Sequence, residues 1–368
     1  MTVNRDVYRD ENATAALLTA VPGTGIGDFG ARLQVRLSQT ISLGRVIHAT
    51  PETRAGLRAM ISSVNWPGAL VTNLGLTSWG PSRPLNFLAN IGIAFRTRRH
   101  RQTVVLLHNV VESMNIEHSG YHVGAFTLKG AHLAVQALER CKIIVFSDET
   151  ARVLRERYEI SPALVRPLPC DTPANTPATS NLHGSCPTVI IPGYLSPYKG
   201  LETLPEVKRL VQSPCRFIVI GGPHNTLLRD PGYRTRLTSL VNDLRAAEIR
   251  VAGRLADTEF DSALRHSTLG LLPYSSTQGG SAMFSHLASM GVPVIATELP
   301  EFRWLETLGA GVLCTGPDPR EIASAIDRLL SDSGELSRLR ERQARFATKF
   351  SWSGFGSEIA SLIRNDAN

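Results

Sequence analysis

Short apolar runs rich in β-branched residues recur along the chain, separated by longer stretches with helix-compatible spacing. Runs of this kind predict buried strands, and their alternation with helices predicts a parallel sheet covered on both faces. In the first half, the expected strands are Thr14–Thr19, Arg45–His48, Ala69–Thr72, Thr103–Leu107 and Lys142–Phe146, with helices that include Gly30–Ser38 and Gly124–Arg140.

The second half repeats this rhythm after a polar stretch, Asp171–Ser185, which is rich in Pro, Thr, Ser and Asn and has the character of a linker. The expected strands are Thr188–Ile191, Arg216–Ile220, Ile249–Val251, Leu269–Leu272, Val294–Ala296 and Val312–Leu313, with helices around Leu204–Val211, Tyr233–Ala247, Ser281–Met290 and Pro319–Leu330. The pattern predicts an α/β protein of two Rossmann-like doubly wound domains that face each other across a cleft, with ligands at the carboxyl ends of the strands.

Composition agrees with two globular domains in a reducing compartment. The 368 residues suffice for two domains of ~150 residues each, and no apolar run approaches the ~18 residues of a membrane span. The polar N-terminus does not resemble a signal peptide. Five scattered cysteines without metal-ligand spacing predict free thiols, and so a cytoplasmic protein without a metal site.

The net charge of +7 is spread along the chain except for one basic run, Arg96–Arg101. The run follows an apolar helix-compatible stretch, Leu85–Phe95, and so suits a basic helix C-terminus. It also suits a patch for anionic lipid headgroups or a phosphorylated acceptor, which would place the protein at the membrane periphery. The absence of interleaved aromatic residues and of any nucleic-acid-binding signature argues against a nucleic-acid partner.

Two glycine turns carry the candidate chemistry. Residues 191–200 read Ile-Pro-Gly-Tyr-Leu-Ser-Pro-Tyr-Lys-Gly, an apolar run followed by a turn with Lys199 at the start of a helix-like segment. A second turn, Gln278–Ser281, also follows an apolar strand. Backbone amides at such turns and a nearby ammonium group bind phosphate. Two of them on neighbouring strands predict a diphosphate held from two sides.

Four landmarks in order resemble those of the retaining nucleotide-sugar glycosyltransferases of GT-B fold, in glycosyltransferase family four (glycosyl transferases group 1). They are Gly193–Gly200, Gly270–Ser275, Met290–Thr297 and Phe350–Trp352, and weaker matches lie at Gly25–Gly27, Leu107–Asn109, Phe146–Glu149 and Pro167–Asp171. The resemblance covers essentially the whole chain. It implies an N-terminal Rossmann-like acceptor domain over 1–170, a linker over 171–187, a nucleotide-sugar donor domain over 188–349 and a C-terminal helix over 350–368 that crosses back to the first domain.

The resemblance implies transfer of a hexose from a nucleoside diphosphate sugar to an acceptor hydroxyl of a glycan, glycolipid or secondary metabolite, with retained configuration and without a metal or cofactor. It gives catalytic roles to His108 and Lys199. The implied donor-binding residues are Gly193, Tyr194, Lys199, Gly253, Arg254, Gln278, Gly279, Gly280, Ser281 and His286, and Gly25, Ile26 and Gly27 lie on the acceptor side.

Most of these residues also have a purely structural interpretation. Lys199 can be a solvated lysine at a helix start, Ser281 an N-cap, and His108 a buried histidine with a backbone partner. Glycines 25 and 27 can form a plain turn. Glu301, in a loop beyond a strand, can face the cleft or be solvated.

The chain departs from the family pattern at three positions. The family's two glutamates correspond to Gln278 and His286, and its arginine after the first glycine corresponds to Tyr194. Gln and His can still hydrogen-bond hydroxyl groups, but neither supplies a fixed negative charge. Two further hypotheses therefore stay open: a sugar-nucleotide-binding protein with weakened catalysis, and a GT-B sugar-nucleotide epimerase.

Overall fold

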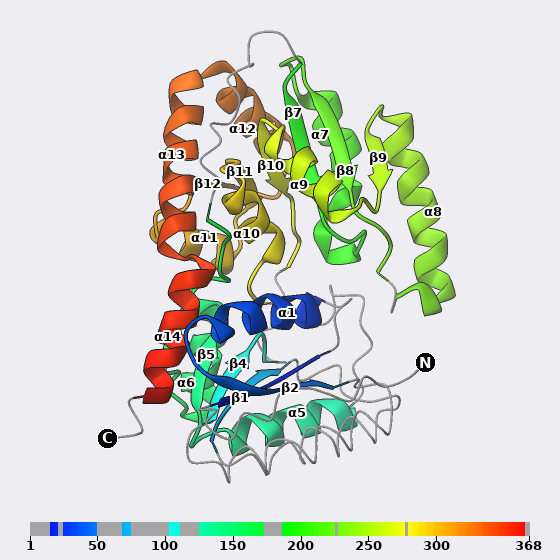
Figure 1. The fold of residues 1–368 in the computed structure, drawn as a ribbon. Coiled ribbons are helices and arrows are strands. Elements are labelled where there is room, and N and C mark those ends of the chain that lie inside the picture. The colour runs from blue at the N-terminus through cyan, green and yellow to red at the C-terminus, as the bar shows by residue number, and fades with distance from the viewer. Residues whose placement is uncertain are drawn as a thin grey trace. The chain divides into compact units, whose positions relative to one another are not determined.

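The computed structural model describes residues 15–20, 25–49, 68–74, 103–110, 125–172, 186–224, 227–276 and 279–364. These residues fall into two compact units. Unit 1 holds the described residues up to Pro167 together with those from Trp352 onward, and unit 2 holds those from Leu168 to Ser351 (Figure 1).

Unit 1 is built on a six-stranded parallel sheet with the order β2-β1-β3-β4-β5-β6. Its strands are β1 Ala15–Ala20, β2 Leu43–Ala49, β3 Ala69–Leu74, β4 Thr103–Leu107, β5 Lys142–Val145 and β6 Leu164–Val165. All five residues of β4 are buried, as expected for an apolar strand covered on both faces. The strand order reverses between β1 and β3, and open α/β sheets bind ligands outside the carboxyl ends of the strands at such a point.

The described helices of unit 1 are α1 Gly25–Ser38, α5 Ala125–Ala137, α6 Asp148–Tyr158 and α14 Trp352–Arg364. Helices α1 and α5 lie on opposite sides of the sheet (Figure 1). Helix α1 approaches β1 closely because residue 30 is glycine: a Cβ there would lie 1.8 Å from Oγ1 of Thr19. Helix α14 packs against α1, with the rings of Trp352 and Phe29 4.8 Å apart.

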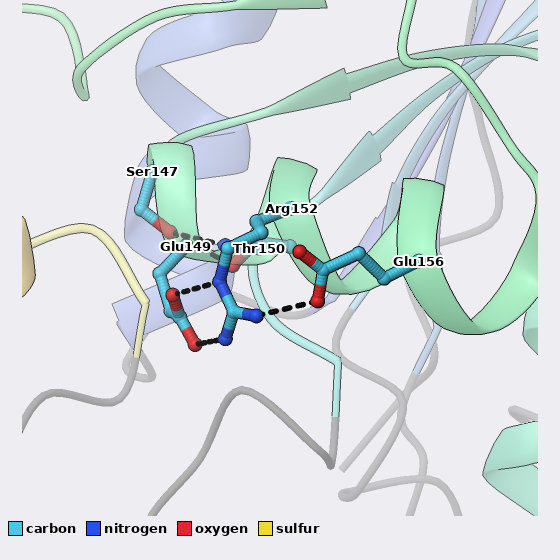
Figure 2. A network of polar contacts seen from close by, with 5 residues as sticks. All are labelled: Ser147, Glu149, Thr150, Arg152 and Glu156. Carbon is cyan, nitrogen blue, oxygen red and sulfur yellow. Dashed lines mark hydrogen bonds and ion pairs between the residues drawn. The ribbon is translucent and has the colours of Figure 1, made fainter.

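Helix α6 shows how local sequence fixes an element. The hydroxyl of Ser147 caps its start by accepting a hydrogen bond from the amide of Thr150 at 3.1 Å. Arg152 lies between Glu149, one turn before it, and Glu156, one turn after it, and pairs with both (Figure 2). The motif Phe146–Glu149 therefore marks the end of β5 and the N-cap of α6.

Unit 2 contains a second six-stranded parallel sheet, with the order β12-β11-β10-β7-β8-β9. Its strands are β7 Thr188–Pro192, β8 Arg216–Ile220, β9 Arg250–Gly253, β10 Leu269–Leu272, β11 Val294–Thr297 and β12 Val312–Thr315. This is the strand order of the Rossmann fold, and it reverses between β7 and β10. The two faces are buried separately: Val189 and Ile191 join one apolar cluster, and Ile190 joins the other.

Prolines and capping residues start many helices of unit 2. Helix α7 packs against α12, and α10 against α13. The helical segments are the 3-10 turns η3 Pro197–Lys199, η4 Leu201–Thr203 and η5 Leu227–Arg229, and the α-helices α7 Leu204–Leu210, α8 Pro231–Ala246, α9 Asp257–Arg265, α10 Ala282–Ser289, α11 Pro300–Thr307, α12 Pro319–Ser331 and α13 Ser333–Lys349.

Among the described residues, two segments connect the units, and these segments are hydrogen-bonded to each other. The first crossing is at Pro167 and Leu168, and the second follows Ser351. Next to them, the amide of Cys170 donates to the carbonyl of Phe350 at 2.9 Å, and Cys170 forms a parallel bridge with Ser351. Helix α14 thus completes unit 1 although α13, directly before it, belongs to unit 2.

The expected α/β fold with two parallel sheets is confirmed, but several boundaries differ. The helix expected over Gly30–Ser38 begins at Gly25, so Gly25 and Gly27 form its first turn instead of a loop. The strand expected over Ile249–Val251 continues to Gly253. Helices α6, α9, α11 and α13 were not expected, because polar residues outnumber the apolar ones along them. None of the described helices is long and apolar enough to cross a bilayer.

Candidate functional site

The first glycine turn lies at the point where the strand order of unit 2 reverses. Strand β7 ends before Gly193, which has a φ of +127°, and the chain then forms η3 with Lys199 at its end. The carboxyl end of the neighbouring strand β10 leads directly into Tyr274. Lys199 and Tyr274 are therefore brought together by the two strands that flank the switch point.

Lys199 is a buried cation. Its side chain is 7% exposed, and Nζ lies 3.6 Å from the centroid of the Tyr274 ring and 4.8 Å from that of Tyr198. A cation over an aromatic face gains electrostatic stabilisation from the ring. Within the part of the chain that the structure describes, no carboxylate forms an ion pair with Nζ. The interpretation of Lys199 as a solvated lysine is therefore wrong.

Burial lowers the pKa of Lys199 to about 7, and the charge of Glu301 opposes this shift. The physical reason is that a desolvated ammonium group loses its hydration and recovers only part of that energy from its neighbours. An anionic ligand at Nζ would stabilise the charged form and raise this pKa again.

Glu301 is the acid that the sequence left ambiguous between a cleft position and a solvated loop. It lies in the first turn of α11 and is only 3% exposed, so it is not solvated. Its Oε1 accepts a hydrogen bond from the amide of Ser281, and its Oε2 has no partner among the described residues. Burial raises the pKa of Glu301 to about 8, although the Ser281 amide and Lys199 both oppose the shift.

The start of α10 is the second glycine turn. Gly279 has a φ of +99°, and the hydroxyl of Ser281 accepts from the amide of Phe284 at 3.2 Å, so Ser281 is an N-cap as its residue type allows. Because Glu301 occupies the amide of Ser281, this amide is not open to a ligand. Among the described residues, the structure records no acceptor for the amides of Ala282 and Met283, which makes them the candidates for anion binding.

The two turns converge. A Cβ on Gly193 would lie 3.2 Å from Cγ of Met283 and 3.7 Å from Nζ of Lys199. The buried ammonium group and the first turn of α10 thus approach the same glycine. This juxtaposition of a cation with helix N-terminal amides is what the sequence predicts for a diphosphate site.

The remaining expected donor residues lie on other segments of unit 2. Tyr194 is 37% exposed, and its ring contacts that of His224 at 5.1 Å in a T-shaped arrangement. Arg254 follows Gly253 at the end of β9 and is exposed. His286 lies on α10, with its ring 5.8 Å from Phe260.

Some of the expected site residues cannot be placed, because the structure does not describe them. Gln278 lies outside the described residues, and Gly280 lies between Gly279 and the cap of α10. The basic run Arg96–Arg101 also lies outside them. Among the described residues, no group of three or more His, Cys, Asp or Glu side chains converges as metal ligands would.

His108 is the candidate residue of unit 1. It follows β4 directly and is half-buried between the rings of Phe29 at 4.8 Å and Phe146 at 4.9 Å. Its Nε2 lies 2.6 Å from Oδ1 of Asn73, so its partner is a side chain and not the backbone group considered from the sequence. Burial lowers the pKa of His108 to about 4, which keeps the ring neutral at physiological pH.

A comparison with known protein families matches residues 186–332 to the model of the glycosyl transferases group 1. This segment belongs to that family. It contains the turn with Lys199, the start of α10 and Glu301, so the candidate diphosphate site lies inside the matched segment.

Curated relatives of this glycosyl transferase group 1 domain are distant and longer. A D-inositol 3-phosphate glycosyltransferase of Corynebacterium urealyticum is 25% identical over 160 residues, which is 43% of this chain and 37% of the relative. A GDP-mannose-dependent alpha-(1-6)-phosphatidylinositol monomannoside mannosyltransferase of Mycobacterium tuberculosis is 27% identical over 195 residues, 50% of this chain and 49% of the relative. The match thus spans less than half the length of either relative.

Solved structures extend the fold assignment to the whole chain. HepE of Anabaena in complex with UDP superposes with a TM-score of 0.70 at 15% identity, covering 95% of this chain and 99% of HepE. Sucrose-phosphate synthase from Thermosynechococcus elongatus superposes with a TM-score of 0.68 at 15% identity, covering 95% and 98%. The protein therefore has the GT-B fold of such glycosyltransferases.

Proposed function

We propose that this protein is a retaining glycosyltransferase that moves a hexose from a nucleoside diphosphate sugar to an acceptor hydroxyl. The observation that carries the proposal is Lys199, a buried ammonium group without an ion pair among the described residues, beside the open amides of α10. A buried cation of this kind is costly unless an anion uses it. The family of the matched segment and the UDP complex of HepE support a diphosphate as that anion.

The chemistry needs only groups that the site and its substrates supply. The bond between the anomeric carbon and the donor's phosphate oxygen breaks, and Lys199 with the amides of Ala282 and Met283 stabilises the charge that develops on the diphosphate. The acceptor oxygen bonds to the anomeric carbon on the same face, and its proton passes to the departing phosphate oxygen. The positive charge comes from the protein, so the proposal includes no metal or cofactor.

The other expected residues have roles in this proposal. Tyr194 and Gly193 line the diphosphate, Gly253 and Arg254 flank the base, and Gln278 and His286 hydrogen-bond hydroxyl groups of the donor. His108 contacts the transferred sugar, and Gly25–Gly27, in the first turn of α1, lie on the acceptor side.

The test is a panel of UDP-, GDP-, ADP- and dTDP-hexoses assayed for thermal stabilisation, donor hydrolysis and transfer. Lys199→Met is the test variant, and Lys208→Met is the matched control. Lys208 also stacks on an aromatic ring, at 5.3 Å from the centroid of Phe217. Its ammonium group donates a hydrogen bond to the carbonyl of Cys215, which precedes the amino end of β8, so it lies away from the carboxyl ends of the strands. Stabilisation and turnover by one nucleotide class, lost only in Lys199→Met, are expected.

Other outcomes of this panel favour the other hypotheses. Stabilisation without hydrolysis or transfer would identify a binding protein with weakened catalysis. Release of a sugar nucleotide with one inverted ring carbon would identify an epimerase. Equal stabilisation of both lysine variants would contradict the role of Lys199.

We further propose a lipid-linked acceptor, and with it a place at the cytoplasmic face of a membrane. The mycobacterial relative is named for a phosphatidylinositol monomannoside acceptor, and the basic run Arg96–Arg101 suits anionic headgroups. The test is co-sedimentation with phosphatidylinositol-containing liposomes. Replacement of arginines 96, 98, 99 and 101 by serine should abolish it, and unchanged sedimentation would contradict this acceptor class.

A further inference from the structure

A chain of side-chain hydrogen bonds runs across three strands of unit 1. Nε2 of His108 lies 2.6 Å from Oδ1 of Asn73, and Nδ2 of Asn73 donates to Oγ1 of Thr19 at 2.9 Å. Thr19 lies on β1, Asn73 on β3 and His108 directly after β4, and these strands are neighbours in the sheet. These hydrogen bonds therefore cross the point where the strand order of unit 1 reverses, which is where such sheets bind ligands.

The first two residues of this hydrogen-bond chain are buried and tightly packed. Thr19 and Asn73 are both 0% exposed. A Cβ on Gly30 would lie 1.8 Å from Oγ1 of Thr19, so α1 closes directly over the hydroxyl group. A side-chain amide enclosed in this way has little free volume in which to rotate.

The direction of these hydrogen bonds specifies which nitrogen of His108 carries the proton. Because the amide nitrogen of Asn73 donates to Thr19, its oxygen faces His108. An amide oxygen only accepts, so Nε2 of His108 must be the protonated nitrogen. In a neutral imidazole the other nitrogen, Nδ1, then holds the lone pair.

The surroundings favour a neutral ring. The rings that pack around His108 come from α1, with Phe29, and from the end of β5, with Phe146, and neither carries a charge. Trp352 and Phe355 of α14 extend the same cluster through Phe29. Burial lowers the pKa of His108 in this setting. The ring is thus a hydrogen-bond acceptor at Nδ1.

We propose that Asn73 is a positioning residue that holds His108 in the Nε2–H tautomer, so that Nδ1 accepts a hydrogen bond from a substrate hydroxyl group. The proposal rests on the proposed transferase function for its substrate and deepens it. A neutral lone pair repels a phosphate oxygen, which is also an acceptor, and binds a hydroxyl donor. His108 therefore recognises a hydroxyl group of a substrate and not a phosphate oxygen.

The test reads the tautomer directly, in long-range proton–nitrogen correlation spectra of the isotope-labelled full chain at neutral pH. The wild type should show His108 as a single Nε2–H tautomer, and Asn73→Leu should give a mixture. Asn73→Asp places a carboxylate at Nε2 and should convert His108 to the doubly protonated form. A wild-type Nδ1–H tautomer, or an unchanged spectrum in Asn73→Leu, would overturn the proposal.

Two further variants control the experiment. Gln136→Leu removes a side-chain amide whose Nε2 lies 3.2 Å from Nε2 of His132 on the exposed side of α5, and it should leave the His108 signals unchanged. Thr19→Val keeps the shape of the buried site and frees the amide of Asn73 to turn. It should also give mixed tautomers, which keeps the test decisive if Asn73→Leu does not fold.

Kinetics separate this proposal from the proposed function. Asn73→Leu should raise the KM of one substrate roughly 10-fold, as expected for one lost hydrogen bond, with a smaller change in kcat. A fixed Nε2–H tautomer in a protein without transferase activity would contradict the function and leave the positioning role intact. Full transferase activity with the reversed tautomer would contradict the positioning role alone.

Discussion

Arg166 in unit 1 and Lys199 in unit 2 are both buried cations that stack on an aromatic ring, yet their partners differ. The guanidinium carbon of Arg166 lies 4.6 Å from the centroid of Phe355, and the group also pairs with Glu358 and donates to the carbonyl of Pro167. Lys199 stacks more closely, at 3.6 Å from Tyr274, but has no ion pair among the described residues. A buried cation that already has protein partners stabilises the fold, whereas one without them is a candidate for binding an anionic ligand.

The largest effect that tests this contrast is expected from Lys199→Met. Loss of the ammonium group should lower kcat/KM for sugar transfer by roughly 10²–10³, because the developing charge of the diphosphate loses its main cation. The melting temperature should not fall, since methionine fills the same space without burying a charge. Steady-state kinetics check the loss of kcat/KM, and thermal unfolding checks the melting temperature. A destabilised variant with normal kinetics would mean that Lys199 serves the fold and not a ligand.

Arg166→Met should show the opposite behaviour. It removes the guanidinium group that ties α14 to unit 1 and should lower the free energy of unfolding by about 2–3 kcal/mol. Denaturant titration measures this loss. The affinity for a nucleoside diphosphate, measured by calorimetry on the folded protein, should be unchanged, and a weaker affinity would mean that Arg166 also serves the ligand.

Glu301→Gln should change the pH dependence of the free energy of unfolding. The folded protein raises the pKa of Glu301 from 4.5 to about 8, so ionising this carboxyl group costs stability increasingly as the pH rises from 4.5 to 8. Glutamine keeps an acceptor for the Ser281 amide without that cost. The variant should therefore be more stable than the wild type at pH 8, by at most about 4 kcal/mol, and equal to it at pH 4.5.

Glu298→Gln is the matched control for this measurement. Glu298 is half exposed and pairs with Arg303, so its replacement should change stability little at either pH. Lys199 changes the stability in the opposite direction. Because its pKa is lowered to about 7, burying its charge costs the most stability below about pH 7, and this cost falls as the pH rises toward 10.5. If the stability gained by Glu301→Gln grew as the pH fell, Glu301 would not be the buried carboxyl group whose ionisation costs stability.

The smallest effect is expected from Glu358→Gln. The Glu358 side chain is 43% exposed, so its charge is screened, and glutamine can still accept from Arg166. The free energy of unfolding should fall by about 0.5–1 kcal/mol, measured by thermal unfolding. A loss as large as that of Arg166→Met would show that the charge of Glu358, and not the packing of the guanidinium group, holds α14.

The fold and the centre of the candidate site could be predicted because their signals are local. Lys199 and the caps of α10 are coded within a few residues of the strands that they follow, and apolar runs reveal the strands themselves. The position of Glu301 could not be predicted, because its partner Ser281 lies twenty residues away in the sequence and its burial arises only in the folded structure. The role of Asn73 could not be predicted for the same reason: its contact with His108 joins positions separated by 35 residues, and the neighbouring sequence contains no motif that indicates it.

Helix α14 has a consequence for the order in which the protein is made. Because its residues fill the aromatic cluster of unit 1, the part translated first cannot finish its core until residues 352–364 have left the ribosome, whereas the core of unit 2 is complete once Ser351 has emerged. The half that is synthesised later is thus able to fold first. The exposed aromatic surface of the waiting half, around Phe29 and Phe146, is then where a nascent chain of this protein would need a chaperone.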